Sequence, residues 1–266
     1  MEPLTPLAPP NASAAPSATP SAAPSAAPSA AWGVVSAVIP CLDEEDTIGP
    51  VVAAVLAQGV AEVIVVDGGS SDRTAARAEA AGARVVREGR RGYGRAIQSG
   101  IRAMRPDAGI ALFLDGDGSD PPERIPDVLG PVASGQADFV LGSRLRGARE
   151  AGALSPQQVV AGRLAGLLLR AGYGVRFTDM SPFRAIRRDR LDALGMREET
   201  YGWNLEMMMR VAAAGLRAVE VPVGQRRRTG GVSKVSGNRR ASLEAAWKIT
   251  TTYLRLAAEL RRSATA

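Results

Sequence analysis

Short apolar runs alternate with segments of helical periodicity between residues 34 and 144. The runs are rich in Val, Ile and Leu and are bounded by Pro, Gly or Asp, which is typical of buried strands. They cover residues 34–39, 62–66, 84–86, 110–114 and 138–141. Between them, apolar residues recur at spacings of three and four, which predicts helices over 46–58, 72–81, 94–104 and 121–133. Strands that alternate with helices predict an α/β fold with a mostly parallel sheet.

The second half of the chain is less regular. We expect helices over 156–171 and 203–214 and strands over 183–186 and 216–221. A final helix is predicted over 239–262, and one of its faces carries Leu243, Trp247, Thr250, Leu254 and Ala257. We expect this face to pack on the sheet or on a second subunit, and binding to an anionic membrane is the alternative.

Composition divides the chain into three parts. Residues 1–31 are almost entirely Ala, Pro and Ser, so this segment cannot bury enough apolar area to offset its chain entropy. We expect a disordered tail over 1–31, an α/β domain over 32–237 and a basic amphipathic helix over 238–266. The tail is a poor secretory signal, no run of 18 apolar residues occurs, and Cys41 is the single cysteine. These features favour a cytoplasmic protein.

Positive charge is concentrated near the C-terminus. The net charge is +6, and residues 226–262 contain ten Lys or Arg and two Glu. Such a segment suits phosphate groups, an anionic membrane or nucleic acid. The chain has no histidine, which excludes histidine bases and histidine metal ligands.

Polar residues follow three of the predicted strands. They are Asp67, the loop 115–120 and the pair Ser143-Arg144. Parallel sheets bind ligands beyond the carboxyl ends of their strands, so a site is expected at this edge. Within the loop, Asp115 and Asp117 offer hard oxygen ligands that suit Mg²⁺ or Mn²⁺ bridging a diphosphate. Gly116 lets the backbone approach such a ligand closely.

At this point the sequence resembles a known family, the inverting family 2 glycosyltransferases of the GT-A fold. The motifs that carry the resemblance lie in order between residues 34 and 237. They are 38–44 (VIPCLDE), 65–74 (VVDGGSSDRT), 92–100 (GYGRAIQSG), 115–117 (DGD), 138–144 (DFVLGSR) and 179–185 (DMSPFRA). The last two are similar to segments of the polyprenyl-phosphate sugar synthase branch. The resemblance implies a Rossmann-like sheet flanked by helices, with a helical extension at the C-terminus.

The resemblance also implies roles for individual residues. A UDP- or GDP-linked sugar would be held by Pro40, Asp43, Glu44, Asp67, Gly94, Arg95, Asp115 and Gly116. A polyprenyl phosphate acceptor would be held by Arg144, Arg163, Ser181 and Lys234. Asp43 and Gly68 stand where the family commonly has Asn-Glu and a second Asp, so the nucleobase stays open. The branch often ends in membrane segments, whereas this sequence suggests at most a peripheral place at the inner face of the cell membrane.

The acceptor decides whether a base is needed. A phosphate acceptor is already ionised, whereas a hydroxyl acceptor must lose a proton to a carboxylate. Asp117, as a metal ligand, and Asp179 and Glu206, as candidate bases, form the expected catalytic set. A hydroxyl of a small molecule or glycan is therefore the alternative acceptor.

Three rival functions remain at this point. A sugar-phosphate nucleotidyltransferase should have a Gly-rich loop with a basic residue after its first strand, but here residues 40–44 are acidic. A nucleic-acid-binding module would fit the basic segment, although that segment lacks interleaved aromatics, so no nucleic acid is expected. A non-catalytic member of the family is disfavoured by the intact Asp115 and Asp117. The function expected is envelope glycan or glycolipid synthesis.

Overall fold

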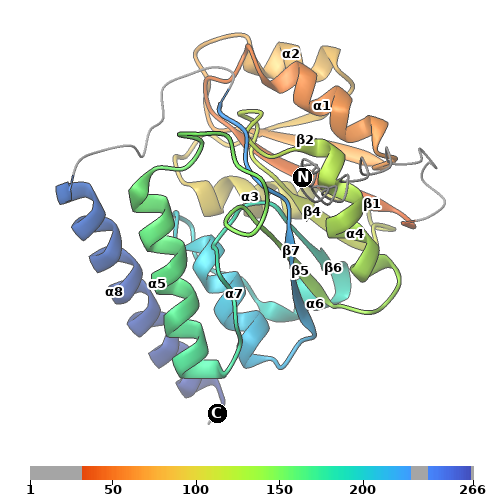
Figure 1. Cartoon of the computed structure of the whole chain (residues 1–266). Coiled ribbons are helices and arrows are strands. Elements are labelled where there is room, and N and C mark those ends of the chain that lie inside the picture. The colour runs from red at the N-terminus through yellow and green to blue at the C-terminus, as the bar shows by residue number, and fades with distance from the viewer. Residues whose placement is uncertain (1–31, 229–238, 265–266) are drawn as a thin grey trace, which may run out of the picture.

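The computed structural model describes residues 32–228 and 239–264 of the 266-residue chain. Its centre is a seven-stranded sheet in the order β3-β2-β1-β4-β6-β5-β7 (Figure 1). The strands are β1 (Val35–Cys41), β2 (Glu62–Asp67), β3 (Arg84–Arg87), β4 (Ile110–Phe113), β5 (Phe139–Ser143), β6 (Arg184–Arg187) and β7 (Ala218–Pro222). Only β6 runs against its neighbours, β4 and β5, and the other pairs are parallel. The prediction of a mostly parallel α/β sheet is confirmed.

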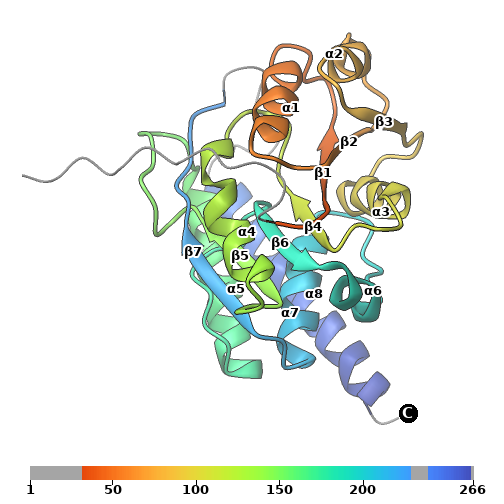
Figure 2. The same cartoon turned by 90° about the vertical axis from the view of Figure 1, so that its right-hand side faces the viewer.

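Helices cover both faces of this sheet (Figure 2). One face carries α1 (Ile48–Ala57), α2 (Thr74–Ala80) and α4 (Ile125–Ala133), which follows a short 3-10 turn, η1 (Pro122–Arg124). The other face carries α3 (Tyr93–Ala103), α5 (Pro156–Tyr173), α6 (Arg188–Leu194), α7 (Trp203–Ala213) and α8 (Arg239–Ala264).

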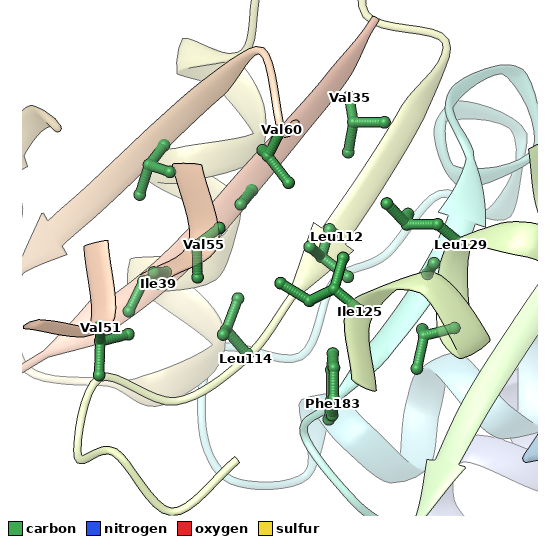
Figure 3. Packing of buried hydrophobic residues seen from close by; sticks show 14 of the residues in the cluster. Val35, Ile39, Val51, Val55, Val60, Leu112, Leu114, Ile125, Leu129 and Phe183 are labelled. Carbon is green, nitrogen blue, oxygen red and sulfur yellow. The ribbon is translucent and has the colours of Figure 1, made fainter. Parts of the chain in front are cut away.

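Alternation along the strands produces two hydrophobic cores. In β1, Val35 and Ile39 belong to the core under α1 and α4, whereas Val38 belongs to the core under α3. Figure 3 shows the first of these cores, where Leu112 and Leu114 from the β4 segment lie beside residues of α1 and α4. The strands β1, β2, β4 and β5 are therefore buried on both sides, which explains why they read as continuous apolar runs.

Helix α8 packs on α5 and α7 through a face other than the predicted one. Tyr253 and Leu256 are buried, whereas Trp247 and Leu254 from the predicted face are exposed. The hydroxyl of Tyr253 donates to the carbonyl of Leu168 on α5 at 3.0 Å. Packing on the body of the protein was expected, but the face was wrong, because the apolar residues of α8 surround much of the helix. Among the described residues, no helix is both long and apolar enough to cross a membrane.

Candidate active site

Polar groups gather at the edge where the parallel strands end. There β2 ends at Asp67, β5 ends at Ser143, and the chain leaves β4 into the loop 114–121. Because β6 is antiparallel, the segment before it, 179–183, begins at the same edge. A strand over 183–186 was predicted but its antiparallel direction was not, and this direction explains how a motif far along the sequence reaches the others.

The loop after β4 concentrates negative charge. Asp117 and Asp120 are buried and Asp115 is half-buried. The backbone N–H of Asp115 donates to Asp120 at 3.0 Å, and that of Ser119 donates to Asp117 at 2.9 Å. Burial, followed by the charges of Asp120 and Asp117, raises the pKa of Asp115 well above its usual range. Burial also raises the pKa of Asp120 to about 7.

Gly116 is required by protein packing. A Cβ atom at this position would lie 2.3 Å from the Cys41 sulfur and 3.3 Å from the side chains of Ile39 and Ile48. The carbonyl of Gly116 accepts a hydrogen bond from the Thr47 hydroxyl at 2.8 Å. Contact with the end of β1 is thus one reason for glycine between the two carboxylates, and the predicted approach to a ligand stays a prediction.

Arg228 places a positive charge on the acidic loop. Its Nε lies 2.6 Å from Oδ2 of Asp117, and its NH1 lies 3.7 Å from Oε1 of Glu44. The guanidinium therefore sits where a cation is electrostatically favoured. Arg228 was missed as a site residue, because it lies in a run of three arginines and only the fold selects one of them.

The donor set fits a divalent cation. Asp115 and Asp117 present carboxylate oxygens, and the pKa of Asp115 is raised by burial and then by the negative charges of Asp120 and Asp117, which a cation would offset. Within 32–228 and 239–264, no three acidic, Cys or His side chains form a closed metal site. The loop therefore suits a cation whose remaining ligands come from substrate oxygens or water.

The first two loops, where a nucleoside was expected, are tied to each other. Asp43, at a positive φ of 53°, accepts hydrogen bonds from the backbone and the hydroxyl of Ser71 at 2.8 and 3.1 Å. Asp67 is buried and accepts from the N–H of Ser70 at 2.9 Å. Pro40 lies within β1 beside β2. The expected residues are thus brought together, with Asp43 engaged by the neighbouring loop.

The start of α3 contacts both the acidic loop and the segment before α7. The Tyr93 hydroxyl lies 3.4 Å from Asp115, and its ring stacks on Tyr201 with centroids 5.9 Å apart. Gly94 has no room for a side chain, because a Cβ would lie 2.2 Å from the Glu198 carbonyl. Arg95 forms an ion pair with Glu199. Tyr93 therefore joins the site, although it was quoted in a motif only.

Arg144 and Asp179 form a buried ion pair at the end of β5. Nε and NH2 of Arg144 donate to the carboxylate at 2.9 and 2.8 Å, and the backbone N–H donates at 2.9 Å. Met180 contributes a fourth donor at 2.7 Å. Burial raises the pKa of Asp179, but the hydrogen bonds and charge of Arg144 outweigh it, so the net pKa lies below its usual value.

The remaining predicted residues lie in different surroundings. Ser181 is buried, and its hydroxyl accepts from the N–H of Phe183 at 3.1 Å. Arg163 is exposed on α5, next to Gly162, which packs against Asp179. Lys234 lies outside the described residues.

Glu206 is buried in α7, where its carboxylate accepts hydrogen bonds from the loop that precedes the helix. It accepts hydrogen bonds from the backbone of Arg197 and Glu198 at 3.1 and 2.7 Å, and from Nε of Arg210 at 2.8 Å. These contacts favour a structural role for Glu206 over the role of a general base.

The comparison with family models decides the identity of the fold. The model described as glycosyl transferase family 2 matches residues 36–195. The chain belongs to this family. The match covers the acidic loop and the Arg144–Asp179 pair, so the resemblance inferred from the motifs is confirmed, as is the expectation of an enzyme.

Known proteins are similar to this chain over most of its length. A glycosyltransferase of Mycobacterium tuberculosis is 38% identical over 219 residues, which span 81% of this chain and 97% of that protein. A dolichyl-phosphate hexose transferase of Haloferax volcanii is 35% identical over 74% of this chain and 84% of that protein. The crystal structure of glucosyl-3-phosphoglycerate synthase from Mycobacterium tuberculosis, with Mn²⁺, UDP and glucosyl-3-phosphoglycerate, is 25% identical. Its TM-score is 0.65, and the match covers 85% of this chain and 80% of that one.

Proposed function

We propose that this glycosyltransferase moves a sugar, with inversion, from a UDP- or GDP-linked donor to a polyprenyl phosphate. The observation that carries the proposal is the buried Arg144–Asp179 pair at the same strand edge as the acidic loop. It fixes a guanidinium beside the predicted donor site and engages the carboxylate of Asp179, one of the two candidate bases. The dolichyl-phosphate hexose transferase among its relatives supports the same class of acceptor.

The donor is held by residues from the first four strands. Asp67, Pro40 and Glu44 face the nucleoside, and the N-terminus of α3 with Arg95 faces the diphosphate, because helix N-termini favour anions. Asp115 and Asp117 hold Mg²⁺ or Mn²⁺, as the neighbouring structure with Mn²⁺ and UDP supports. When bound, the cation supplies Lewis-acid stabilisation of the negative charge on the leaving diphosphate.

Both candidate bases are already committed to other donors. Four N–H groups reach Asp179, and three groups donate to Glu206. Neither carboxylate is free to take a proton from a hydroxyl. A phosphate acceptor needs no such transfer, because its oxygen is already an anion and attacks the anomeric carbon directly. One C–O bond forms, and the bond to the diphosphate breaks on the opposite side, which inverts the configuration.

Arg144 is suited to hold the acceptor phosphate. A guanidinium has five N–H donors, and Asp179 uses two of them. The other three have no hydrogen-bond partner among the described residues, and arginine binds phosphate with good geometry. Arg163, Ser181 and Lys234 remain proposed contacts. A lipid-linked acceptor would place the enzyme at the inner face of the cell membrane.

The test is a transfer assay with a panel of UDP- and GDP-sugars, with Mg²⁺ or Mn²⁺, and with a short-chain polyprenyl phosphate. Asp117→Asn should abolish turnover, whereas Asp127→Asn on the exposed side of α4 should not. Proton NMR of the product should report an inverted anomeric centre. Transfer to phosphoglycerate or a sugar hydroxyl instead would establish the alternative acceptor class, and no turnover with any donor would refute the proposal.

A further inference from the structure

Two neighbouring helices expose most of the large apolar side chains on the surface. Of the six large hydrophobic residues exposed in the described chain, four lie on α5 and α8. They are Val160 (47% exposed), Leu167 (64%), Trp247 (73%) and Leu254 (61%). Within each helix the two residues are seven apart, which places them on one side two turns from each other. We call these four residues, with exposed Arg163 and Arg170 beside them, the α5/α8 face.

This face points away from the body of the protein. On α5, Ala165 and Leu169 are buried in the core under the sheet. On α8, Tyr253 and Leu256 are buried, and Tyr253 bonds to α5. Figure 1 shows the two helices side by side at the outer flank of the molecule. Because the buried sides are turned inward, the exposed apolar residues are left without a protein partner in the described chain.

Positive charge is concentrated on the same two helices. Together α5 and α8 contain eight Lys or Arg and two Glu, which equals the net charge of +6 of the whole chain. The sequence outside the two helices is therefore neutral overall. Two large apolar residues on each of two basic helices, with Arg163 and Arg170 exposed on α5, form the pattern of a surface that inserts shallowly among anionic lipids.

We propose that the α5/α8 face docks the enzyme on an anionic membrane, with Trp247 and Leu254 in the interfacial layer. A second copy of the chain is a poorer occupant, because two-fold pairing would bring two strongly basic faces together. The proposed function explains only what the docking would be for, which is access to a lipid acceptor. Gly162 of α5 packs against Asp179, so the docked helix also borders the Arg144–Asp179 pair.

The test is co-sedimentation of the full chain with vesicles of phosphatidylcholine, alone or mixed with phosphatidylglycerol. We expect binding to the mixed vesicles only, weakened by added salt. Leu254→Glu should weaken this binding at least about tenfold, because it removes an inserted side chain and adds a repelled charge. Val219→Glu is the matched control, since Val219 is also exposed but lies on β7.

Tryptophan emission gives a second measurement. Trp203 is fully buried, whereas Trp247 is exposed, so insertion should shift the emission of Trp247 to the blue. Trp247→Phe should keep the vesicle binding and lose most of the shift. Absence of binding to anionic vesicles would overturn the docking, as would a dimer that Leu254→Glu dissociates. Transfer to a short-chain, water-soluble polyprenyl phosphate should survive Leu254→Glu, so failure of docking and failure of the proposed function are distinguishable.

Discussion

The contact between Arg228 and Asp117 predicts a competition for metal. Oδ2 of Asp117 faces the Arg228 guanidinium at 2.6 Å, and the same oxygen is a predicted ligand of Mg²⁺ or Mn²⁺. A cation that binds this oxygen must displace the guanidinium. Arg228→Gln removes the competing charge but keeps a polar, hydrogen-bonding side chain. We therefore expect the variant to bind Mn²⁺ more tightly than the wild type when no nucleotide is present.

The size of the change in Mn²⁺ affinity follows from the solvent exposure of the Arg228 side chain. The side chain of Arg228 is 35% exposed, so water and salt screen its ion pair. Pairs of this kind contribute roughly 0.2–1 kcal/mol. At about 1.4 kcal/mol per tenfold change, the dissociation constant of Mn²⁺ should fall by about 1.4- to 5-fold.

Titration with Mn²⁺ at low ionic strength, followed by the electron paramagnetic resonance signal of the free ion, measures this constant. Arg226→Gln is the matched control, because Arg226 lies two residues earlier and pairs with Glu123. Both variants lose one positive charge, and only one loses the contact with Asp117. Equal Mn²⁺ affinity of the two variants, or weaker binding by Arg228→Gln, would refute the competition.

Three further predictions concern stability. Asp179→Asn leaves Arg144 buried without a counter-charge, so urea unfolding should show a loss of about 3–5 kcal/mol, and an unchanged midpoint would contradict this. Gly116→Ala should cost about 1–3 kcal/mol through its clash with the Cys41 sulfur, and adding Cys41→Ala should recover part of that loss, whereas additive losses would argue against the clash. Finally, the folded pKa of Asp120 is about 7, above the unfolded value of about 3.9, so the folded state holds a proton that the unfolded state has released between these values. Stability of the metal-free protein should therefore fall as pH rises from 5 to 7, by up to about 1.4 kcal/mol per pH unit, and thermal unfolding should show a flatter profile for Asp120→Asn.

The absence of histidine makes the pH dependence of stability easier to assign to Asp120. A chain without imidazole groups has few other side chains that titrate between pH 5 and 7. A slope in this window therefore reports mainly on the acidic loop. Stability that rises with pH would contradict the raised pKa of Asp120.

The sheet could be predicted because each strand is marked by the pattern of its own few residues. The central parallel strands are buried on both faces and show continuous apolar runs, as residues 62–66 illustrate. The end of each run marks the ligand-binding edge, so Asp67 and the loop 115–120 could be placed together before any contact was known. The same reasoning placed Arg144, since it follows the run 138–141.

Pairings between distant segments could not be read in this way. The direction of β6 depends on the path of α5, and no local pattern around Arg184 records it. The packed side of α8 is decided by the shape of α5 and α7, so Tyr253 is buried where Trp247 was expected. The engagement of Glu206 by the backbone of residues 197 and 198 is also non-local. Each failure concerns a choice between neighbours that only tertiary packing makes.

The two arginine–aspartate pairs of the site differ in burial, and this difference separates their roles. In the Arg144–Asp179 pair, both side chains are less than a tenth exposed, so breaking it would strand a charge in a dry environment. Such a pair persists through the reaction and presents a fixed guanidinium. In the Arg228–Asp117 pair, water reaches the arginine, and the contact can be exchanged at small cost. An enzyme without histidine can therefore use arginine both as a permanent part of its site and as a counter-charge that leaves when the metal and donor arrive.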